Sequence, residues 1–226
     1  MGQTITLTAH DGHNLSAYEK TPSSGTVRGG LVVVQEIFGV NAHIRRVADG
    51  YAEEGYRVIA PAIFDRAERG VELGYDRDDM ERGSALRKAV RIEHMIADIA
   101  AAIERLRGSG KVGIVGYCLG GTLAWLSACR LEGLAAAVGY YGGAIASNLG
   151  ETPRCPVMLH FGEDDPGIPM SDVAKIKATV DPNRVQVFTY KDAGHAFNRE
   201  GSAAWRGEAA RVARERTIAF LRLHVG

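Results

Sequence analysis

The chain has 226 residues, of which 46% are hydrophobic and 24% are charged, so it is long enough to bury a sizeable core. Lysine and arginine together number 27, as do aspartate and glutamate. This balance leaves no excess of positive charge that would attract nucleic acid or an anionic membrane, and we expect neither as a partner.

The cysteines and the N-terminal residues indicate a compartment. Three cysteines are an odd number, and they lack the close pairing of a zinc site, which favours a reducing environment. The chain does not open with a basic segment followed by an apolar stretch, and no run approaches the roughly 18 apolar residues of a membrane span. We therefore expect a globular cytoplasmic protein, without predicting its oligomeric state.

In the first half of the chain, short β-rich runs alternate with helical patterns. The apolar runs are nearly continuous, as is typical of parallel strands covered by helices on both faces. Residues 62–83 are rich in arginine and aspartate without clear periodicity, which predicts a loop or short helices over one edge of the sheet. The predicted elements are an edge hairpin (4–9 and 14–20), a buried strand (30–36), a helix ending at Gly55 (42–55), a strand (56–61) and a long helix from Ser84 to Arg107.

The second half continues the alternation without a repeat, a low-complexity segment or a linker. The whole pattern predicts a single α/β domain over residues 1–226, with a mostly parallel central sheet, helices on both faces and an N-terminal antiparallel hairpin. The predicted elements are strands at 111–116, 134–141, 156–162 and 184–190, a helix at 119–131, a helix capped by Ser171, and a final helix from Ala203 to Leu223.

The stretch "GIVGYCLGG" places Cys118 between a predicted strand and a predicted helix, which is the setting of a nucleophile elbow. Such a turn strains the backbone of the nucleophile, and small neighbours such as Gly116 and Gly120 leave room for it, while Gly121 lets the helix pack closely on the sheet. The helix N-terminus can stabilise a thiolate and then an oxyanion. The amides of Leu119 and of Ile37, in the loop after the first buried strand, are the predicted oxyanion donors.

The turn at Cys118 has two other interpretations. A glycine-rich turn can hold a small buried cysteine or cradle a phosphate. This stretch has neither G-x-G-x-x-G spacing nor a GK[ST] ending, however, which argues against a nucleotide site. We therefore favour a nucleophile at Cys118.

A nucleophilic cysteine needs a base and a group that orients the base, and the later chain offers both. His195 lies in "DAGHAF" after the last predicted strand, and "GEDDPGIP" follows an earlier strand with three consecutive acids. We prefer Asp165 to Glu163 and Asp164 because it precedes the turn that begins at Pro166. Nucleophile, acid and base in this order, each at the C-terminal end of a strand, are the arrangement of the α/β-hydrolases.

Four ordered motifs spread over nearly the whole chain resemble those of the dienelactone hydrolases, α/β-hydrolases that open enol-lactones with a Cys-His-Asp triad. The motifs are "VVVQEIFGV" with Glu36, "GYCLGG" with Cys118, "GEDDPGIP" with Asp165, and "AGHAFNR" with His195 and Arg199. The resemblance implies that Glu36 takes part in controlling the protonation of the thiol. In the alternative interpretation, Glu36 is an ordinary salt-bridged residue at a strand end.

The resemblance also implies two arginines that hold a substrate carboxylate. Arg199 follows His195 by four residues and offers a bidentate guanidinium, unless it is an ordinary surface arginine. For the second we choose Arg82 from the polar stretch after "PAIF", with Arg77 and Arg69 as alternatives. That stretch departs from the best-known family members, which leaves the substrate open.

Aromatic residues near the predicted strand ends are candidates for the apolar part of a pocket, although such residues are more often core. We include Phe38, Tyr117 and Phe197 as substrate-binding candidates, with Phe64 and Trp205 as further possibilities. The scattered histidines form no metal-binding motif, and we expect neither a metal nor a cofactor.

The sequence therefore predicts a hydrolase for an enol-lactone or a related small carboxylate-bearing ester, acting through an acyl-enzyme on Cys118. A broader hydrolase of small esters or thioesters is the nearest alternative, because the fold tolerates many substrates. From another class, Cys118 could be a redox-sensing thiol, or the chain could bind small molecules without catalysis.

Overall fold

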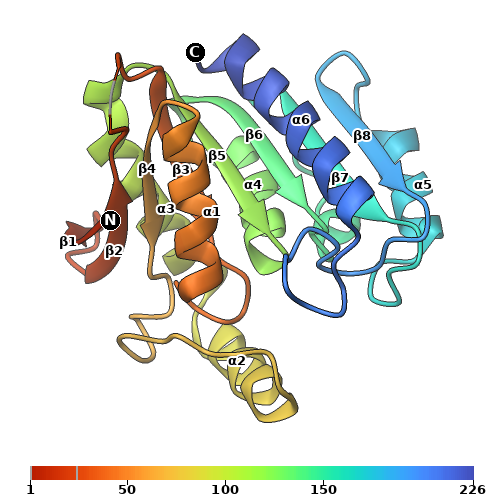
Figure 1. Ribbon diagram of the computed structural model, residues 1–226, viewed down its shortest axis with the longest axis horizontal. Coiled ribbons are helices and arrows are strands. Elements are labelled where there is room, and N and C mark those ends of the chain that lie inside the picture. The colour runs from red at the N-terminus through yellow and green to blue at the C-terminus, as the bar shows by residue number, and fades with distance from the viewer. Residues whose placement is uncertain (1, 24) are drawn as a thin grey trace. The chain divides into compact units, whose positions relative to one another are not determined.

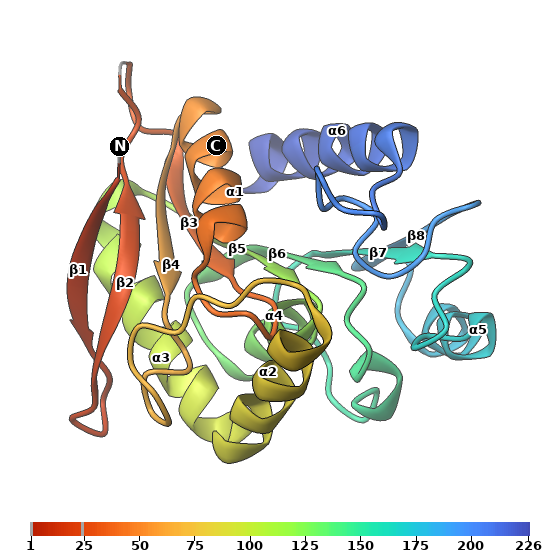
Figure 2. The same ribbon diagram turned by 60° about the horizontal axis from the view of Figure 1, so that its bottom comes forward.

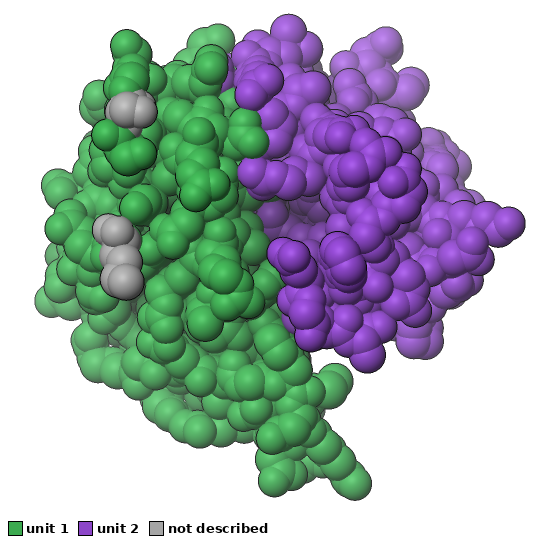
Figure 3. Space-filling view, in the orientation of Figure 1, with its two compact units in different colours: residues 1–114, 225 green, residues 115–224, 226 purple. Residues whose placement is uncertain are grey.

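The computed structural model describes residues 2–23 and 25–226, which fall into two compact units. Unit 1 runs to Ile114 and includes Val225, and unit 2 runs from Val115 to His224 and includes Gly226 (Figure 3). Strand β5 (Val112–Tyr117) contributes its first half to unit 1 and its second half to unit 2. The single domain expected from the sequence stays a prediction.

The strands of unit 1 follow the order β1-β2-β4-β3-β5 (Figure 1). Strands β1 (Gln3–Thr8) and β2 (Asn14–Lys20) form the predicted antiparallel hairpin, and β2 also pairs antiparallel with β4 (Tyr56–Pro61). Strand β3 (Gly29–Val34) runs parallel to β4, and all six of its residues are buried. The continuous apolar run in the sequence therefore marks a strand that is covered on both faces.

Two helices pack on opposite faces of the unit 1 strands (Figure 2). Helix α1 (Ala42–Glu53) begins after Asn41, whose side chain accepts a hydrogen bond from the Ile44 amide at 3.2 Å. After α1 the chain turns at Gly55, which has a φ of 100°. Helix α3 (Ile92–Leu106) buries an apolar stripe and ends in the short 3-10 helix η1 (Arg107–Ser109).

The long helix predicted from Ser84 to Arg107 is wrong, because the chain forms two helices there. Helix α2 (Arg77–Ala89) ends at Val90, which has extended backbone angles, and α3 begins two residues later. Helix α2 also starts inside the stretch predicted to be irregular. The Asp76 side chain caps α2 by accepting a hydrogen bond from the Asp79 amide at 2.8 Å. This cap is hard to recognise in the sequence, because α2 lacks a clear apolar face.

In unit 2 the strand order is β5-β6-β7-β8, with β6 (Leu134–Tyr140), β7 (Val157–Gly162) and β8 (Val185–Tyr190) all parallel. Helices α4 (Leu119–Arg130) and α6 (Gly207–His224) cover opposite faces of these strands, and α5 (Met170–Thr179) lies beside β8 (Figure 2). The 3-10 helix η2 (Ile145–Ser147) follows β6. Mostly parallel strands, covering helices and the opening hairpin confirm the expected fold class.

Two helix starts in unit 2 differ from the prediction. Helix α5 begins at Met170 after Pro169, so Ser171 lies within the helix instead of capping it. Helix α6 begins at Gly207 and not at Ala203, because the preceding residues form turns and the Arg206 amide donates to the Phe197 carbonyl at 2.8 Å. None of the described helices is long and apolar enough to cross a membrane.

A buried polar cluster joins β6, β7, β8 and α6. The Thr217 hydroxyl lies 2.6 Å from the Tyr140 hydroxyl and 3.1 Å from His160 Nε2, and His160 Nδ1 lies 2.8 Å from the Tyr190 hydroxyl. Burial, and to a smaller extent the charge of Arg216, lowers the pKa of His160 to about 3, so this histidine is neutral. The cluster satisfies polar groups that would otherwise be costly to bury.

Replacing Thr217 by valine keeps the shape of the side chain but leaves Tyr140 and His160 without their shared partner. We expect the free energy of unfolding to fall by about 1–3 kcal/mol, measured by urea denaturation. Thr179→Val is the control, because the exposed Thr179 hydroxyl donates only to the Lys175 carbonyl and water can replace that bond. Equal losses in the two variants would contradict a structural role for the cluster.

Candidate active site

The backbone turns sharply at Cys118, between β5 and α4. Cys118 has a φ of 55° and a ψ of −114°, a conformation that side-chain-bearing residues rarely adopt. Its amide donates to the Tyr140 carbonyl at 3.0 Å, and its side chain is neither fully buried nor fully exposed. The turn therefore has the strain and the accessible thiol of a nucleophile elbow.

Two glycines allow this turn to close. A Cβ atom on Gly116 would lie 1.8 Å from the Gly120 carbonyl oxygen, and one on Gly121 would lie 2.3 Å from the Tyr140 carbonyl oxygen. Both contacts involve backbone atoms, which cannot move aside cheaply. The close approaches predicted at Gly116 and Gly121 are thereby confirmed.

Cys118 occupies the N-cap position of α4, so the helix begins at Leu119. The first amides of a helix have no acceptor within it, and the positive end of the helix dipole favours negative charge there. An anionic sulfur, and later an oxyanion, at this point would be stabilised by the Leu119 amide and its neighbours.

Asp165 and His195 are joined by a hydrogen bond. His195 Nδ1 lies 2.7 Å from Asp165 Oδ2, and Asp165 is 4% exposed. The other carboxylate oxygen accepts from the Gly167 amide at 2.8 Å, so the turn after Pro166 fixes the carboxylate. Of the three consecutive acids it is Asp165 that meets the histidine, whereas Glu163 and Asp164 are exposed.

His195 is also hydrogen bonded to the side chain of Cys118. Burial of the imidazole works against its charged form, but the hydrogen bonds to Asp165 and Cys118, and the charges on both, raise the pKa of His195 to about 10. The three predicted residues therefore form one hydrogen-bonded series in unit 2, and its histidine carries a proton at neutral pH.

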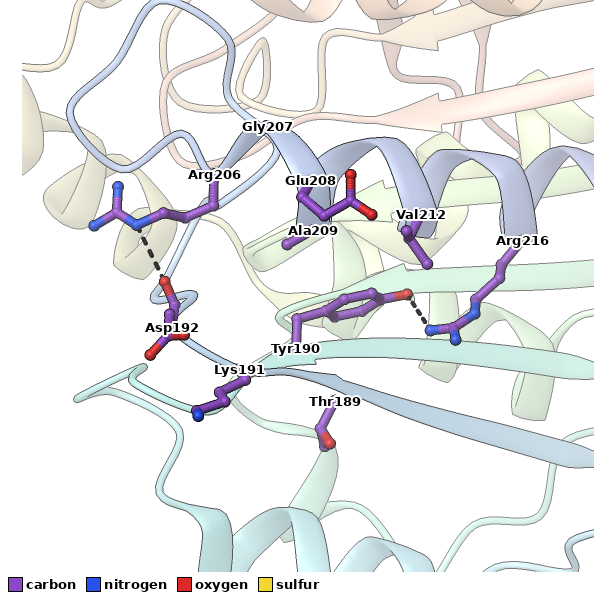
Figure 4. A pocket seen from close by; sticks show the side chains of 10 residues that line it. All are labelled: Thr189, Tyr190, Lys191, Asp192, Arg206, Gly207, Glu208, Ala209, Val212 and Arg216. Carbon is purple, nitrogen blue, oxygen red and sulfur yellow. Dashed lines mark hydrogen bonds between the residues drawn. The ribbon is translucent and has the colours of Figure 1, made fainter.

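Arg206 braces the loop that carries His195. Asp192 and Ala196, which lie on either side of His195, have φ values of 56° and 60°. The Arg206 guanidinium donates from Nε to the Asp192 carbonyl at 3.1 Å, as Figure 4 shows. The same figure shows the side chains that line a pocket between the end of β8 and the start of α6. The pocket has a volume of about 520 Å³, and none of the predicted site residues lines it.

Four of the predicted site residues belong to unit 1. Glu36 is 1% exposed and Ile37 follows it in the loop after β3. Phe38 is 5% exposed and packs edge-on against Tyr75, with ring centroids 4.7 Å apart, so it is a core residue of unit 1. Arg82 lies on the exposed side of α2 and forms an ion pair with Glu68.

The alternative arginines of the same stretch also have partners. Arg77 pairs with Glu81 at 3.0 Å, and Arg69 donates to the Asn14 carbonyl at 2.7 Å. In unit 2, Arg199 is half-buried, and its amide donates to the Ala196 carbonyl at 2.9 Å. Which arginine of residues 66–91 would contact a substrate stays open.

The two aromatic candidates of unit 2 are core residues that lie close to Cys118 and His195 in the chain. Tyr117 is 2% exposed and stacks on Tyr140 at 4.9 Å, and Phe197 is fully buried against Tyr190 at 5.0 Å. They support the loops that carry Cys118 and His195. Substrate contact by Phe38, Tyr117 or Phe197 stays a prediction.

Sequence reasoning missed Tyr141. Its ring centroid lies 4.8 Å from that of His195, and its hydroxyl donates to Asn198. A bulky residue between a strand and the pair Gly142 and Gly143 was the available signal, because such a turn can force a positive φ.

The described residues contain no group of three or more histidine, cysteine, aspartate or glutamate side chains placed to hold a metal ion.

Solved structures with a similar fold are hydrolases by their descriptions. A protein of Klebsiella pneumoniae, provisionally assigned as a dienelactone hydrolase, aligns with a TM-score of 0.84 and 26% identity over 97% of both chains. An esterase from Pyrococcus furiosus aligns with a TM-score of 0.72 and 16% identity over 100% of this chain and 93% of its own, which shows the fold alone. The fold is that of an α/β-hydrolase.

The family follows from the sequence comparisons. The model of the Dienelactone hydrolase family matches residues 15–225. Carboxymethylenebutenolidase from Pseudomonas putida is 35% identical over 225 residues, covering 96% of this chain and 94% of its own. Carboxymethylenebutenolidase 1 from Cupriavidus pinatubonensis is 28% identical over 225 residues, covering 96% and 95%. The chain belongs to the dienelactone hydrolase family and is a hydrolase, which confirms the resemblance seen in its motifs.

The proton on His195 has a measurable signature. In an NMR titration of ¹⁵N-labelled histidine side chains, we expect His195 to titrate near its raised pKa of about 10, while His160 stays neutral at neutral and alkaline pH. Asp165→Asn and Cys118→Ala should each lower the pKa of His195. An imidazole titrating near 6.5 in the wild type would contradict the pairing.

The raised pKa of His195 also makes the free energy of unfolding depend on pH. Because the pKa of His195 is raised above its ordinary value of 6.5, its contribution to folding is fully present below pH 6.5 and is lost as the pH rises through about 10. The free energy of unfolding should therefore fall over this range less steeply in Asp165→Asn than in the wild type.

Proposed function

We propose that the chain opens an enol-lactone of the dienelactone type, or a related small carboxylate-bearing ester, through a triad of Cys118, His195 and Asp165. The observation that carries the proposal is the hydrogen-bonded series from Asp165 through His195 to Cys118, which ends at the N-terminus of a helix. Family membership supports the reaction class, and the relatives named carboxymethylenebutenolidase support the substrate class.

In the first step the Cys118 thiolate adds to the substrate carbonyl carbon. A C–S bond forms, and the negative charge moves to the carbonyl oxygen, where the Leu119 amide donates to it. The tetrahedral intermediate then collapses with cleavage of the C–O bond. The leaving oxygen takes the proton from the His195 imidazolium, which leaves a thioester on Cys118 and a neutral imidazole.

In the second step the neutral His195, oriented by Asp165, accepts a proton from a water molecule as that water attacks the thioester. Collapse of the second intermediate releases the carboxylic acid and the Cys118 thiolate, so the starting ion pair is restored. With a lactone the leaving oxygen stays tethered to the acyl group. If it departs as an enolate without taking the His195 proton, then by the family resemblance the enolate itself can accept a proton from the attacking water, and His195 remains protonated.

The family resemblance assigns further roles that remain predictions. Glu36 would control the protonation of the thiol, Ile37 would supply the second oxyanion amide, and Arg199 and Arg82 would hold the substrate carboxylate. The aromatic candidates are Phe38, Tyr117 and Phe197.

A broader activity on small esters or thioesters is the second candidate. The observation in its favour is that Arg82 is already paired with Glu68, so a carboxylate on the substrate would have to compete for this guanidinium. A dienelactone hydrolase-like promiscuous phosphotriesterase from metagenomic libraries shares the fold at 21% identity with a TM-score of 0.76, and the fold alone does not fix the substrate.

Substrate profiling tests the proposed function. Wild type, Cys118→Ser, Cys118→Ala and Arg199→Ala are assayed on cis-dienelactone, trans-dienelactone and a neutral p-nitrophenyl ester. We expect lactone turnover to fall by at least about 10³-fold in Cys118→Ala, because the covalent route is lost, and KM for the lactones alone to rise in Arg199→Ala.

Cys129→Ala is the matched control, because burial raises the pKa of its thiol to about 12 and keeps it unreactive. Turnover of the neutral ester alone would favour the broader esterase. Turnover that does not depend on Cys118 would reject the triad, and no turnover of any substrate would favour a sensing or binding role.

The choice of the acid is tested by neutral replacements in the "GEDDPG" turn. Asp165→Asn should lower kcat by about 10²- to 10⁴-fold, because the imidazole loses the group that fixes its tautomer and orientation. Asp164→Asn should change kcat less than about twofold, since its side chain is exposed and the backbone bond from its amide to the Ala193 carbonyl is retained. Similar losses in both variants would contradict a specific role for Asp165.

A further inference from the structure

We propose that Tyr141, anchored by Asn198, is a positioning residue that holds the imidazole of His195 during catalysis. The inference rests on the proposed function, since it concerns the base of the same triad. It adds two residues to which neither the motifs nor the family resemblance gave a role.

The backbone of Tyr141 is strained. Its φ is 38°, in the left-handed region that a bulky aromatic residue rarely occupies. Its amide donates to the His160 carbonyl at 2.8 Å, so the end of β6 remains tied to β7 while the chain turns. Strain of this kind persists only where surrounding contacts hold it, and it concentrates at functional sites.

The side chain of Tyr141 contacts His195 directly. The ring centroids lie 4.8 Å apart at an angle of 55°, and Tyr141 is fully buried. The Tyr141 ring also meets Phe197 edge-on at 5.8 Å. One aromatic side chain thus contacts both the predicted base and a core residue of the loop that carries it.

The hydroxyl of Tyr141 donates to Asn198 Oδ1, three residues after His195. This bond ties the end of β6 to the loop that contains the histidine, and it does so beyond Ala196, where φ is 60°. The loop is therefore held on both sides of its strained residue, by Arg206 at Asp192 and by Tyr141 at Asn198.

The chemistry explains why such a contact would matter. In the resting site the imidazole has two hydrogen-bond partners, Asp165 and Cys118. Once Cys118 carries the acyl group, its sulfur is no longer an anion, and the imidazole keeps only its bond to Asp165. A ring held by one bond can swing about it, so the tilted contact with the Tyr141 ring would matter most in deacylation, where proton transfer from water needs good alignment.

The test separates positioning from packing. Tyr141→Phe keeps the ring and removes the hydroxyl, Asn198→Leu removes the acceptor, and Asn198→Asp retains an acceptor. Acylation and deacylation rates are measured separately by burst kinetics with p-nitrophenyl acetate, alongside kcat and KM. Tyr18→Phe is the control, because it removes a tyrosine hydroxyl of unit 1 that donates to Asp49 and not to the His195 loop.

We expect Tyr141→Phe and Asn198→Leu each to slow deacylation by about 10-fold with the acylation rate unchanged, so that kcat and KM fall together, and the double variant to be no slower than either single one. Asn198→Asp should stay within about twofold of the wild type. Wild-type deacylation in both Tyr141→Phe and Asn198→Leu would overturn the proposal, as would an equal loss in Tyr18→Phe.

The two proposals fail in different ways. If Cys118→Ala keeps full turnover of the same ester, the triad and the positioning role are both rejected. If turnover depends on Cys118 while the Tyr141 and Asn198 variants behave as wild type, only the positioning role is rejected. Urea denaturation of each variant shows whether it is folded, and the half-buried Asn198 provides a second test should Tyr141→Phe be unstable.

Discussion

The arrangement of the site depends on the strained turn at Cys118. A non-glycine residue at a φ of 55° costs of the order of 1–3 kcal/mol, so neighbouring contacts must enforce it. The structure supplies them through the bond from the Cys118 amide to the Tyr140 carbonyl and through the backbone contact that Gly116 permits with Gly120. These contacts are made by backbone atoms, and they place the thiol at the start of α4.

The end of β6 contacts both Cys118 and His195. The Tyr140 carbonyl accepts from Cys118, and the next residue, Tyr141, contacts His195. The Tyr140 side chain belongs to the polar cluster with Thr217 and neutral His160, which locks β6 to β7 and α6. A buried, fully bonded cluster behind this strand end is a physical source of rigidity, since each member would lose a partner if the strand shifted.

The features that the sequence could predict are those that depend on the backbone preferences of a few neighbouring residues. The strand-to-helix glycines identified the turn at Cys118, and the Pro-Gly pair after Asp165 identified which of three acids turns back toward the histidine, because backbone preferences are readable within a few residues. The break between α2 and α3 carries neither proline nor glycine, so apolar periodicity predicted one helix through it. Pairing of Arg82 with Glu68 and the contact of Tyr141 with His195 depend on tertiary neighbours, which no local pattern encodes.

The proton on His195 depends on the charge of Cys118. With a pKa of about 10, the imidazole holds a proton at neutral pH and cannot act as a base until it has given that proton away. In the proposed mechanism it gives the proton to the leaving oxygen after the Cys118 sulfur has bonded to the substrate carbon, when the thiolate charge and the hydrogen bond that help to raise this pKa are gone. The imidazolium is therefore a stronger acid at that stage than in the resting site. Forming the acyl-enzyme would thus itself convert the resting acid into the base that the second step needs.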